Sequence, residues 1–298
     1  MVKFGWVIYN GHLPGNKFKD FAEWIQEAAA KRDINMSIIK NNHLIPTLSQ
    51  EGGTITSLSG GPKPDFVVFG DKDILLAKQL ELTGIPVFNS AEAIAVSDDK
   101  AAAYQILANE KLPIPETLIS PKVFPGSTAI EQDSFLQAGK ILDFPLIIKE
   151  SFGSFGEQVY LVHSSGEMLE KIKEIGDKPF VLQKFISSSF GKDLRLNVVG
   201  SKVVAAMKRT SHSDFRANVS AGGEMESYQP NSEESQLAIE ATKAIGADFA
   251  GVDLLFGPEN KPLICEVNSN AHIKNIYNCT KINVADHIID YIIDKLSK

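Results

Sequence analysis

Two carboxylates and an amide near the C-terminus are the residues whose spacing points most directly to chemistry. Asp253 lies in one apolar, strand-like stretch, and Glu266 and Asn268 lie in the next. Counting back equally from a turn centred at 259/260 places Asp253 opposite Glu266 in an antiparallel hairpin, where opposed Cβ atoms are about 5 Å apart. Glu266 and Asn268 share one strand face. Two such carboxylates need a cation or a proton between them, which favours Mg²⁺; a solvated strand face paired with lysines is the alternative.

A glycine-rich segment follows a second apolar strand that ends in Lys149. The segment runs from Glu150 to Glu157 and reads Glu-Ser-Phe-Gly-Ser-Phe-Gly-Glu. Glycines allow backbone amides to close over a phosphate, and a lysine at a strand end supplies a compact positive charge. The segment is not a Walker A loop, because no Gly-Lys-Ser/Thr follows. An ordinary hairpin turn is the alternative.

Cations at strand or helix ends form the third candidate group: Lys100, Lys149, Arg195, Lys208, Arg209 and Arg216. Arg195 alternates with apolar neighbours, and Arg209 follows an apolar strand. An arginine on a half-buried strand requires an anion partner. That anion is either a ligand phosphate or an internal carboxylate, and both alternatives stay open.

The elements that would position these residues change in character along the chain. The first ninety or so residues alternate strand-like and helix-like stretches, which predicts a parallel sheet. We expect strands at 4–9, 36–39, 66–69 and 86–88, helices at 17–32 and 73–83, and a loop marked by Gly52-Gly53 and 60–62. Further on we expect strands at 144–149, 158–162, 181–186, 194–199 and 203–207, the hairpin, and helices at 97–109, 165–175, 232–245 and 284–296.

Composition excludes several classes of protein. The chain has 298 residues, 43% hydrophobic and 22% charged, typical of a folded α/β protein. No apolar run approaches the roughly 18 residues that span a bilayer. The net charge of −7 argues against a general nucleic-acid or membrane binder. Only Cys265 and Cys279 occur, so a disulfide framework is not expected, and both are predicted to be buried thiols. We expect a cytoplasmic protein.

The order of these motifs resembles the ATP-grasp superfamily, specifically the RimK-like ligases such as the one that adds glutamate to ribosomal protein S6. The resemblance covers about Pro86 to Leu296. It rests on Asn89-Ser90-Ala91, Asp98-Asp99-Lys100, Pro145 to Lys149, Gly153 to Gly156, Val181 to Ile186, Gly191 to Arg195, Val203 to Arg209, Asp214 to Asn218, Ala250 to Leu254 and Glu266 to Ser269. It implies an ATP-grasp fold preceded by a Rossmann-like α/β domain, with domains at 1–96, 97–180 (lid) and 181–298.

The resemblance also implies roles for individual residues. Lys100 and Lys149 match lysines that contact ATP phosphates, and Gly153, Ser154 and Gly156 match the loop that closes over them. The adenine and ribose positions are Gln183, Lys184, Phe185, Ile186 and Asp193. Arg209, Arg216 and Asn218, with Ala217 beside them, match the catalytic cations and their neighbours around the γ-phosphate and acyl-phosphate. Asp253, Glu266 and Asn268 match the magnesium ligands, and Arg195, Asn270 and His272 are candidates for substrate contacts.

The implied reaction joins a carboxylate to an amine. The carboxylate takes the γ-phosphate of ATP, with Mg²⁺ or Mn²⁺ as cofactor, and the amine of an amino acid or small peptide attacks the acyl-phosphate. The segment Ser269 to Ile273 lacks the glycines of the S6-type ligases, so we expect a differently shaped acceptor pocket. The alternatives are phosphoryl transfer without an amide and a catalytically silent nucleotide-binding regulator. The sequence leaves oligomeric state, including a homo-oligomer, open.

Overall fold

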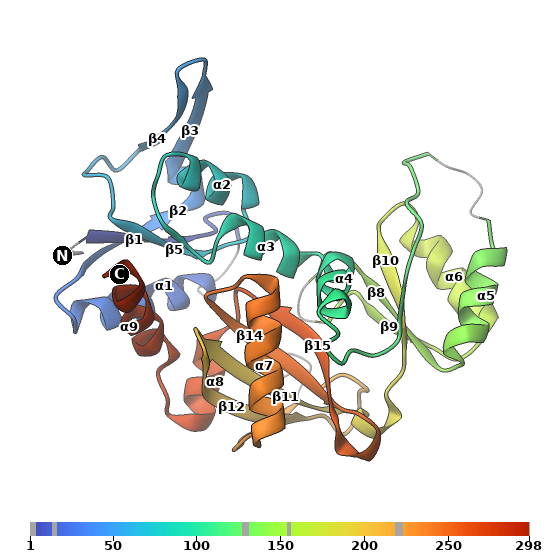
Figure 1. The fold of residues 1–298 in the computed structure, drawn as a ribbon. Helices are drawn as coiled ribbons and strands as arrows, with labels where there is room; N and C mark the ends of the chain where they lie inside the picture. Colours follow the sequence, from blue (N-terminus) through green and yellow to red (C-terminus); the bar gives the residue numbers. More distant parts are fainter. Residues whose placement is uncertain (1–3, 14–16, 127–130, 154–155, 218–222, 298) are drawn as a thin grey trace.

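The computed structural model describes residues 4–13, 17–126, 131–153, 156–217 and 223–297. Its described strands form three main sheets and one small hairpin (Figure 1). No helix in these ranges is long and apolar enough to cross a membrane.

The N-terminal sheet is parallel, as predicted. Its strand order is β2-β1-β5-β6, and each neighbouring pair runs in parallel. The strands are β1 (Phe4–Tyr9), β2 (Asn35–Lys40), β5 (Phe66–Gly70) and β6 (Val87–Phe88), and the helices are α1 (Lys17–Ala30), α2 (Ile74–Leu82) and α3 (Ala91–Asp98). Every residue of β5 is buried, which explains its continuous apolar sequence.

The loop expected around Gly52-Gly53 is instead a hairpin. Strands β3 (Leu44–Ser49) and β4 (Gly52–Ser57) pair in antiparallel register and project from the N-terminal sheet (Figure 1). All positions of β3 after Leu44 are exposed. Since neither face of the hairpin is buried along its length, the sequence lacks the alternation that indicates a strand.

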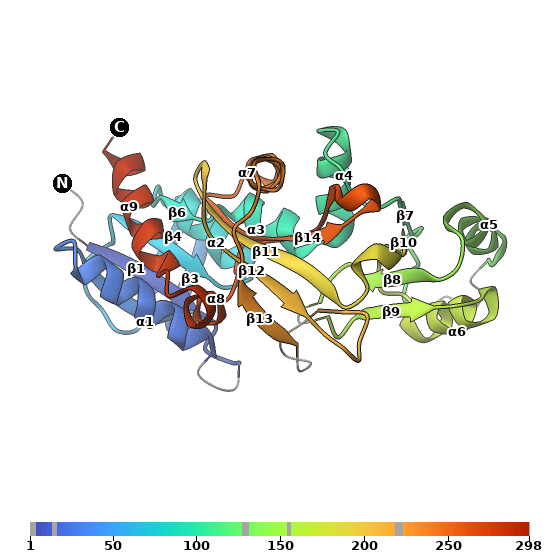
Figure 2. The same ribbon diagram turned by 90° about the horizontal axis from the view of Figure 1, so that it is seen from below.

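The second sheet lies in the predicted lid domain and has the order β7-β10-β8-β9. Its elements are β7 (Thr117–Ile119), β8 (Leu146–Glu150), β9 (Val159–Val162) and β10 (Phe180–Lys184), with α5 (Asp133–Leu142) and α6 (Ser165–Ile175) on the side away from the C-terminal sheet (Figures 1 and 2). The predicted boundary at 180/181 would cut β10, which pairs with β7 and β8. We therefore propose that the lid extends to Lys184.

The C-terminal sheet is antiparallel, with the order β13-β12-β11-β14-β15. Its strands are β11 (Lys192–Val199), β12 (Lys202–Thr210), β13 (Glu224–Ser227), β14 (Phe249–Phe256) and β15 (Pro262–Asn268). The remaining helices are α4 (Lys100–Asn109), α7 (Ser232–Ile245), α8 (Ile273–Thr280) and α9 (Val284–Leu296). The helix predicted at 97–109 begins later, because Asp99 caps α4 by accepting from the Ala101 N–H at 2.9 Å.

The N- and C-terminal sheets share one hydrophobic core. Ile25 of α1, Met207 of β12 and Ile288 of α9 belong to the same buried cluster, and α9 lies beside α1 in both views (Figures 1 and 2). Asn89 links the same two regions. Its buried amide donates to the carbonyls of Phe249 and Ser269 and accepts from the N–H groups of Asp248 and Phe249. These four bonds use the side chain's full donor capacity.

Candidate active site

The hairpin of β14 and β15 places Asp253 opposite Glu266, which confirms the predicted pairing. The register shifts between Asp253 and Leu254, because Leu254 pairs with Ile264 and leaves Cys265 as the extra residue of a bulge. The Glu266 side chain is 30% exposed. The Asn268 amide lies 3.5 Å from the Gly251 carbonyl. Glu266 therefore opens towards solvent where its partner Asp253 is buried.

Asp253 is enclosed by arginines. Arg195 binds both of its oxygens at 2.6 Å, and Arg209 contacts it at 2.9 Å. Arg209 also binds both oxygens of Asp193, at 2.7 and 2.6 Å. Burial opposes ionisation of Asp253, but the two guanidinium groups outweigh it and lower its pKa. Of the two alternatives for these arginines, the structure shows internal carboxylate partners, Asp253 and Asp193; contact with a ligand phosphate stays a prediction.

The two predicted phosphate lysines come from different elements and converge on the same place. Lys100 opens α4, and its Nζ lies 3.3 Å from the Gly153 carbonyl and 3.8 Å from Glu266 Oε1. Lys149 is buried on β8 and donates to the Tyr104 hydroxyl at 2.9 Å. Burial lowers the pKa of Lys100, with Glu266 acting in the opposite direction. The two ammonium groups are partly desolvated and suit an anion, and the neighbouring carboxylate suits a cation. Together they fit an anion that binds as its complex with a metal cation.

Tyr104 and Cys265 belong to this site although no sequence motif indicated them. The Tyr104 hydroxyl donates to the Cys265 carbonyl at 2.6 Å, which secures the bulge of β15. The Cys265 sulfur is 3.6 Å from Lys149 Nζ and is half-buried. Cys279 is half-buried as well, so the expectation that both cysteines are buried thiols is wrong for each. Tyr104 stands four residues after Lys100 in α4, so helical spacing could have placed both on one face.

Arg216 connects the glycine-rich segment to the C-terminal part of the chain. Its Nη1 donates to the Gly156 carbonyl at 2.6 Å, and its other guanidinium nitrogens bind Asp214. Gly156 has a φ of +74°, a conformation that favours glycine. Ala217 is buried. Ser154 and Asn218, both predicted site residues, lie outside the described residues.

The predicted adenine segment follows β10. Gln183 is buried and donates to Thr117 Oγ1 at 2.8 Å, so its side chain supports the sheet. The N–H of Lys184 donates to the Glu116 carbonyl at 2.9 Å and is not available to a base in this conformation. Phe185 packs edge-on against Phe190, with ring centroids 6.3 Å apart, and Ile186 is half-buried.

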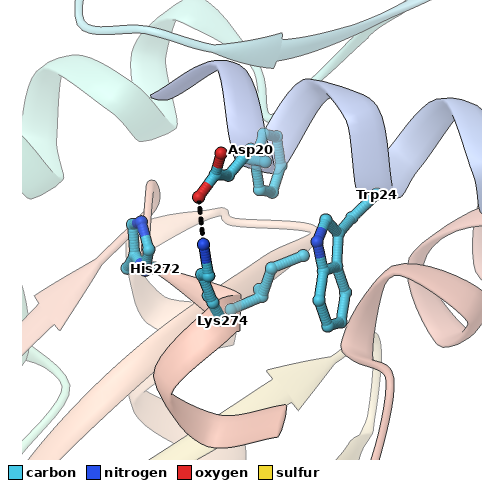
Figure 3. A pocket seen from close by; sticks show the side chains of 6 residues that line it. Asp20, Trp24, His272 and Lys274 are labelled. Atoms are coloured by element: carbon cyan, nitrogen blue, oxygen red, sulfur yellow. Dashed lines mark hydrogen bonds and ion pairs between the residues drawn. The ribbon is translucent and has the colours of Figure 1, made fainter. Parts of the chain in front are cut away.

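The predicted substrate residues follow β15 in a short loop. Ala271 packs so closely on Gly251 that a Cβ at position 251 would lie 2.4 Å from it, and the same point is 3.8 Å from Arg195 Cδ. Only glycine fits there, and it brings the loop against the arginine–carboxylate group. Asn270 is half-buried in this loop. His272 lines a shallow surface depression beside α1 that is too small to enclose a water molecule (Figure 3).

The donor groups present fit a magnesium ion only in part. Within the described ranges no group of three or more His, Cys, Asp or Glu side chains is arranged to hold a metal. Glu266 and Asn268 offer the hard oxygen ligands that Mg²⁺ prefers. Asp253 faces them across the hairpin but is bound by Arg195. A magnesium ion would therefore bind Glu266 and Asn268 and compete with Arg195 for Asp253.

The fold consists of a parallel α/β unit, a lid sheet and an antiparallel sheet. Cations and carboxylates gather where the lid sheet and the antiparallel sheet meet. This is an ATP-grasp architecture. Solved structures agree with this class. PsnB complexed with a minimal precursor has a TM-score of 0.74 at 16% identity, covering 99% of both chains. The D-alanine–D-alanine ligase of Bacillus anthracis complexed with ATP has a TM-score of 0.72 at 17% identity, covering 99% of this chain and 97% of the other.

The RimK-like ATP-grasp domain model matches residues 97–292, and the chain belongs to this family. It is 33% identical over 231 residues to the uncharacterized protein MG012 homolog of Mycoplasma pneumoniae, covering 76% of this chain and 80% of that protein. It is 34% identical over 221 residues to a probable alpha-L-glutamate ligase of Maridesulfovibrio salexigens, covering 73% and 70%. The predicted resemblance is thereby confirmed.

Proposed function

We propose that the protein is an ATP-dependent ligase that forms an amide between a carboxylate and the amine of an amino acid or small peptide, releasing ADP and phosphate. The observation that carries the proposal is the convergence of Lys100, Gly153 and Glu266. One ammonium group touches both the glycine-rich segment and the candidate metal carboxylate. Family membership and the ligases among the relatives and structural neighbours support the same reaction class.

In the proposed first step, a substrate carboxylate oxygen attacks the γ-phosphorus of ATP. Lys100 and Lys149 neutralise the phosphate oxygens, and Arg216 holds the segment that covers them through the Gly156 carbonyl. Mg²⁺, held by Glu266 and Asn268, would balance phosphate charge. Phosphoryl transfer depends mainly on the positions of the reacting groups and on charge neutralisation. The proposed step therefore needs no side-chain nucleophile with its general base.

In the proposed second step, an amine attacks the acyl-phosphate, phosphate leaves and a proton is released. Arg209 is held rigidly by Asp193 and Asp253 at the inner wall of the site. We infer that it steadies the acyl-phosphate, since a pre-positioned guanidinium stabilises developing charge without reorganising. Exclusion of water matters here because an acyl-phosphate hydrolyses.

The test measures ADP and phosphate release from Mg·ATP across a matrix of amino acids and short peptides, with product masses determined. Amine-dependent turnover and a product mass equal to both substrates less one water support the ligase. A phosphorylated product that accumulates without amine identifies a phosphotransferase instead. Tight ATP binding without turnover for any pair supports the silent regulator.

A further inference from the structure

The hydroxyl of Tyr104 lies where helix α4 meets three strands of the candidate active site. Tyr104 is buried, and α4 lies at the junction of the lid sheet and the C-terminal sheet (Figure 1). The hydroxyl donates to the Cys265 carbonyl of β15 at 2.6 Å and accepts from Lys149 Nζ of β8 at 2.9 Å. The side-chain oxygen of Gln183 in β10 lies 3.4 Å away. One hydroxyl therefore contacts both sheets from the helix that Lys100 begins.

The groups around this hydroxyl fix the directions of its hydrogen bonds. A lysine ammonium group can only donate, and a carbonyl oxygen can only accept. Tyr104 therefore gives its single hydrogen to the Cys265 carbonyl and presents a lone pair to Lys149. Burial raises the pKa of Tyr104, although the charge of Lys149 acts in the opposite direction. The hydroxyl consequently keeps its hydrogen at neutral pH.

The bulge in β15 leaves the Cys265 carbonyl available for this bond. Asp253 pairs with Glu266 and Leu254 pairs with Ile264, so Cys265 is the residue that the pairing skips. The skipped residue immediately precedes Glu266, the candidate metal ligand. The tyrosine hydroxyl is thereby fixed to the strand that carries this carboxylate.

Lys149 is a buried ammonium group with uncharged neighbours. Its Nζ donates to Tyr104 and lies 3.6 Å from the Cys265 sulfur, and among the described residues it forms no ion pair with a carboxylate. A buried charge without a counter-ion is costly, so the site favours an incoming anion. A lysine side chain has several rotatable bonds, and fixing it before the anion arrives lowers the entropic cost of binding.

We propose that Tyr104 is a positioning residue that directs the ammonium group of Lys149 towards the phosphates of ATP. The inference rests on the proposed function, because it takes Lys149 to neutralise those phosphates. Lys149 Nζ also lies 5.5 Å from the centroid of the Tyr104 ring, a contact that phenylalanine would retain. Tyr104→Phe therefore isolates the contribution of the hydroxyl.

The test compares a ligand that has phosphates with one that has none. The full-length protein with Mg²⁺ is titrated with the non-hydrolysable analogue AMPPNP by calorimetry and with adenosine by ligand-observed NMR. Tyr104→Phe should weaken AMPPNP binding about tenfold, because a hydrogen bond to a charged group is lost. Adenosine binding should stay unchanged, whereas a general loosening of the site would weaken the binding of both ligands.

Tyr228→Phe is the matched control. Tyr228 packs against the same hydrophobic cluster to which Tyr104 belongs, and its hydroxyl bonds to Glu234 of α7 at 3.1 Å. Removing this hydroxyl should leave both affinities unchanged. The melting temperatures of the two variants report any loss of stability separately from ligand affinity.

A double-mutant cycle with Lys149→Met shows whether Tyr104 acts through Lys149. Lys149→Met by itself should weaken AMPPNP binding at least about tenfold. Adding Tyr104→Phe to Lys149→Met should change the AMPPNP affinity by less than about twofold, since no ammonium group remains to be directed. The double variant also lacks the unpaired buried charge that Tyr104→Phe creates, so it remains informative if the single variant folds poorly.

The inference is overturned if the unaltered protein does not bind AMPPNP, or if Tyr104→Phe binds it as tightly as the unaltered protein does. Equal loss of AMPPNP and adenosine, or an undiminished effect of Tyr104→Phe in the Lys149→Met background, would overturn it as well. The proposed function fails in a different measurement, the absence of ADP release with any substrate pair. A protein with the expected affinities and no turnover would keep this role of Tyr104 and lose the ligase reaction.

Discussion

Arg195 and Asp253 form a two-point ion pair, with Nε and Nη2 each 2.6 Å from one carboxylate oxygen. Because Asp253 is also a candidate metal ligand, Arg195 and a bound Mg²⁺ would compete for it. Replacing Arg195 with Gln leaves Asp253 with Arg209 alone.

We expect Arg195→Gln to lower the Mg²⁺ concentration that gives half-maximal ADP release about threefold to tenfold, a change of about 1 kcal/mol. The maximal rate of ADP release should fall, since the substitution removes the positive charge of Arg195 from the site. Magnesium titrations of ADP release measure both quantities. Arg195→Lys is the control and should lie between. A variant that needs more Mg²⁺ than the unaltered protein would show that Asp253 is not a ligand.

Glu266→Gln should reduce ADP release at least a hundredfold, because the amide keeps the shape of the side chain but removes the charge that holds the metal. ATP binding should weaken only partly, since Lys100 and Lys149 remain. Calorimetric titration with AMPPNP separates the two effects. Glu259→Gln, in the exposed turn of the same hairpin, serves as the control. Near-normal turnover of Glu266→Gln would exclude the magnesium role.

Lys149→Met should raise the KM for ATP at least tenfold, because an apolar chain of similar length replaces the buried ammonium that we propose neutralises the phosphates. Initial rates over a range of ATP concentrations provide the measurement. Lys178, a 62% exposed lysine paired with Glu150, offers the comparison: Lys178→Met should leave the KM unchanged. Equal KM values for both variants would contradict the phosphate role.

Alkylation of Cys265 by iodoacetamide should inactivate the enzyme, and Mg·ATP should protect it, because the thiol lies beside Lys149. Burial raises the pKa of Cys265 above its ordinary value, so the rate should be slow at pH 7 and should still be rising at pH 9. Peptide mass spectrometry follows both thiols. Cys279 in α8 is also half-buried with a raised pKa and should gain no protection from ATP. Equal protection of both would remove Cys265 from the nucleotide site.

Arg32→Gln should lower the melting temperature at pH 7 by about 2 °C. Arg32 holds the pKa of Asp290 below its usual range. A depressed carboxyl pKa stabilises the fold above the unfolded value of about 4, and this stabilisation is lost as pH falls through the folded value. The difference in melting temperature should therefore shrink between pH 5 and pH 2. A constant difference would show that charge is not its source.

The hairpin at the site shows what sequence can predict and how. Counting from a turn centre at 259/260 gave the correct partner for Asp253, but the path differs: Phe256 pairs with Pro262, which centres the turn at Glu259, and the bulge at Cys265 then restores the pairing. A bulge depends on tertiary contacts such as the Tyr104 bond to the Cys265 carbonyl. Such contacts have no local pattern.

Contacts between residues that are far apart in the chain could not be predicted from the sequence. Asp20 and Lys274 are 254 positions apart, and no spacing rule relates them. Buried strands and amphipathic helices, by contrast, have a pattern of apolar residues that reflects which of their faces is buried. The parallel sheet and most helices could therefore be predicted. The exposed hairpin of β3 and β4 was missed for the converse reason: it has little buried face to leave a pattern.

The amide of Asn89 bonds to Ser269, at the start of the loop that carries His272, and to Phe249 of β14. That loop is consequently anchored to the N-terminal sheet, whereas the lid sheet belongs to a separate layer. Under the proposed function, movement of the lid sheet would release ADP while this loop stays anchored. A product held against this loop would then stay bound while ADP is exchanged for ATP.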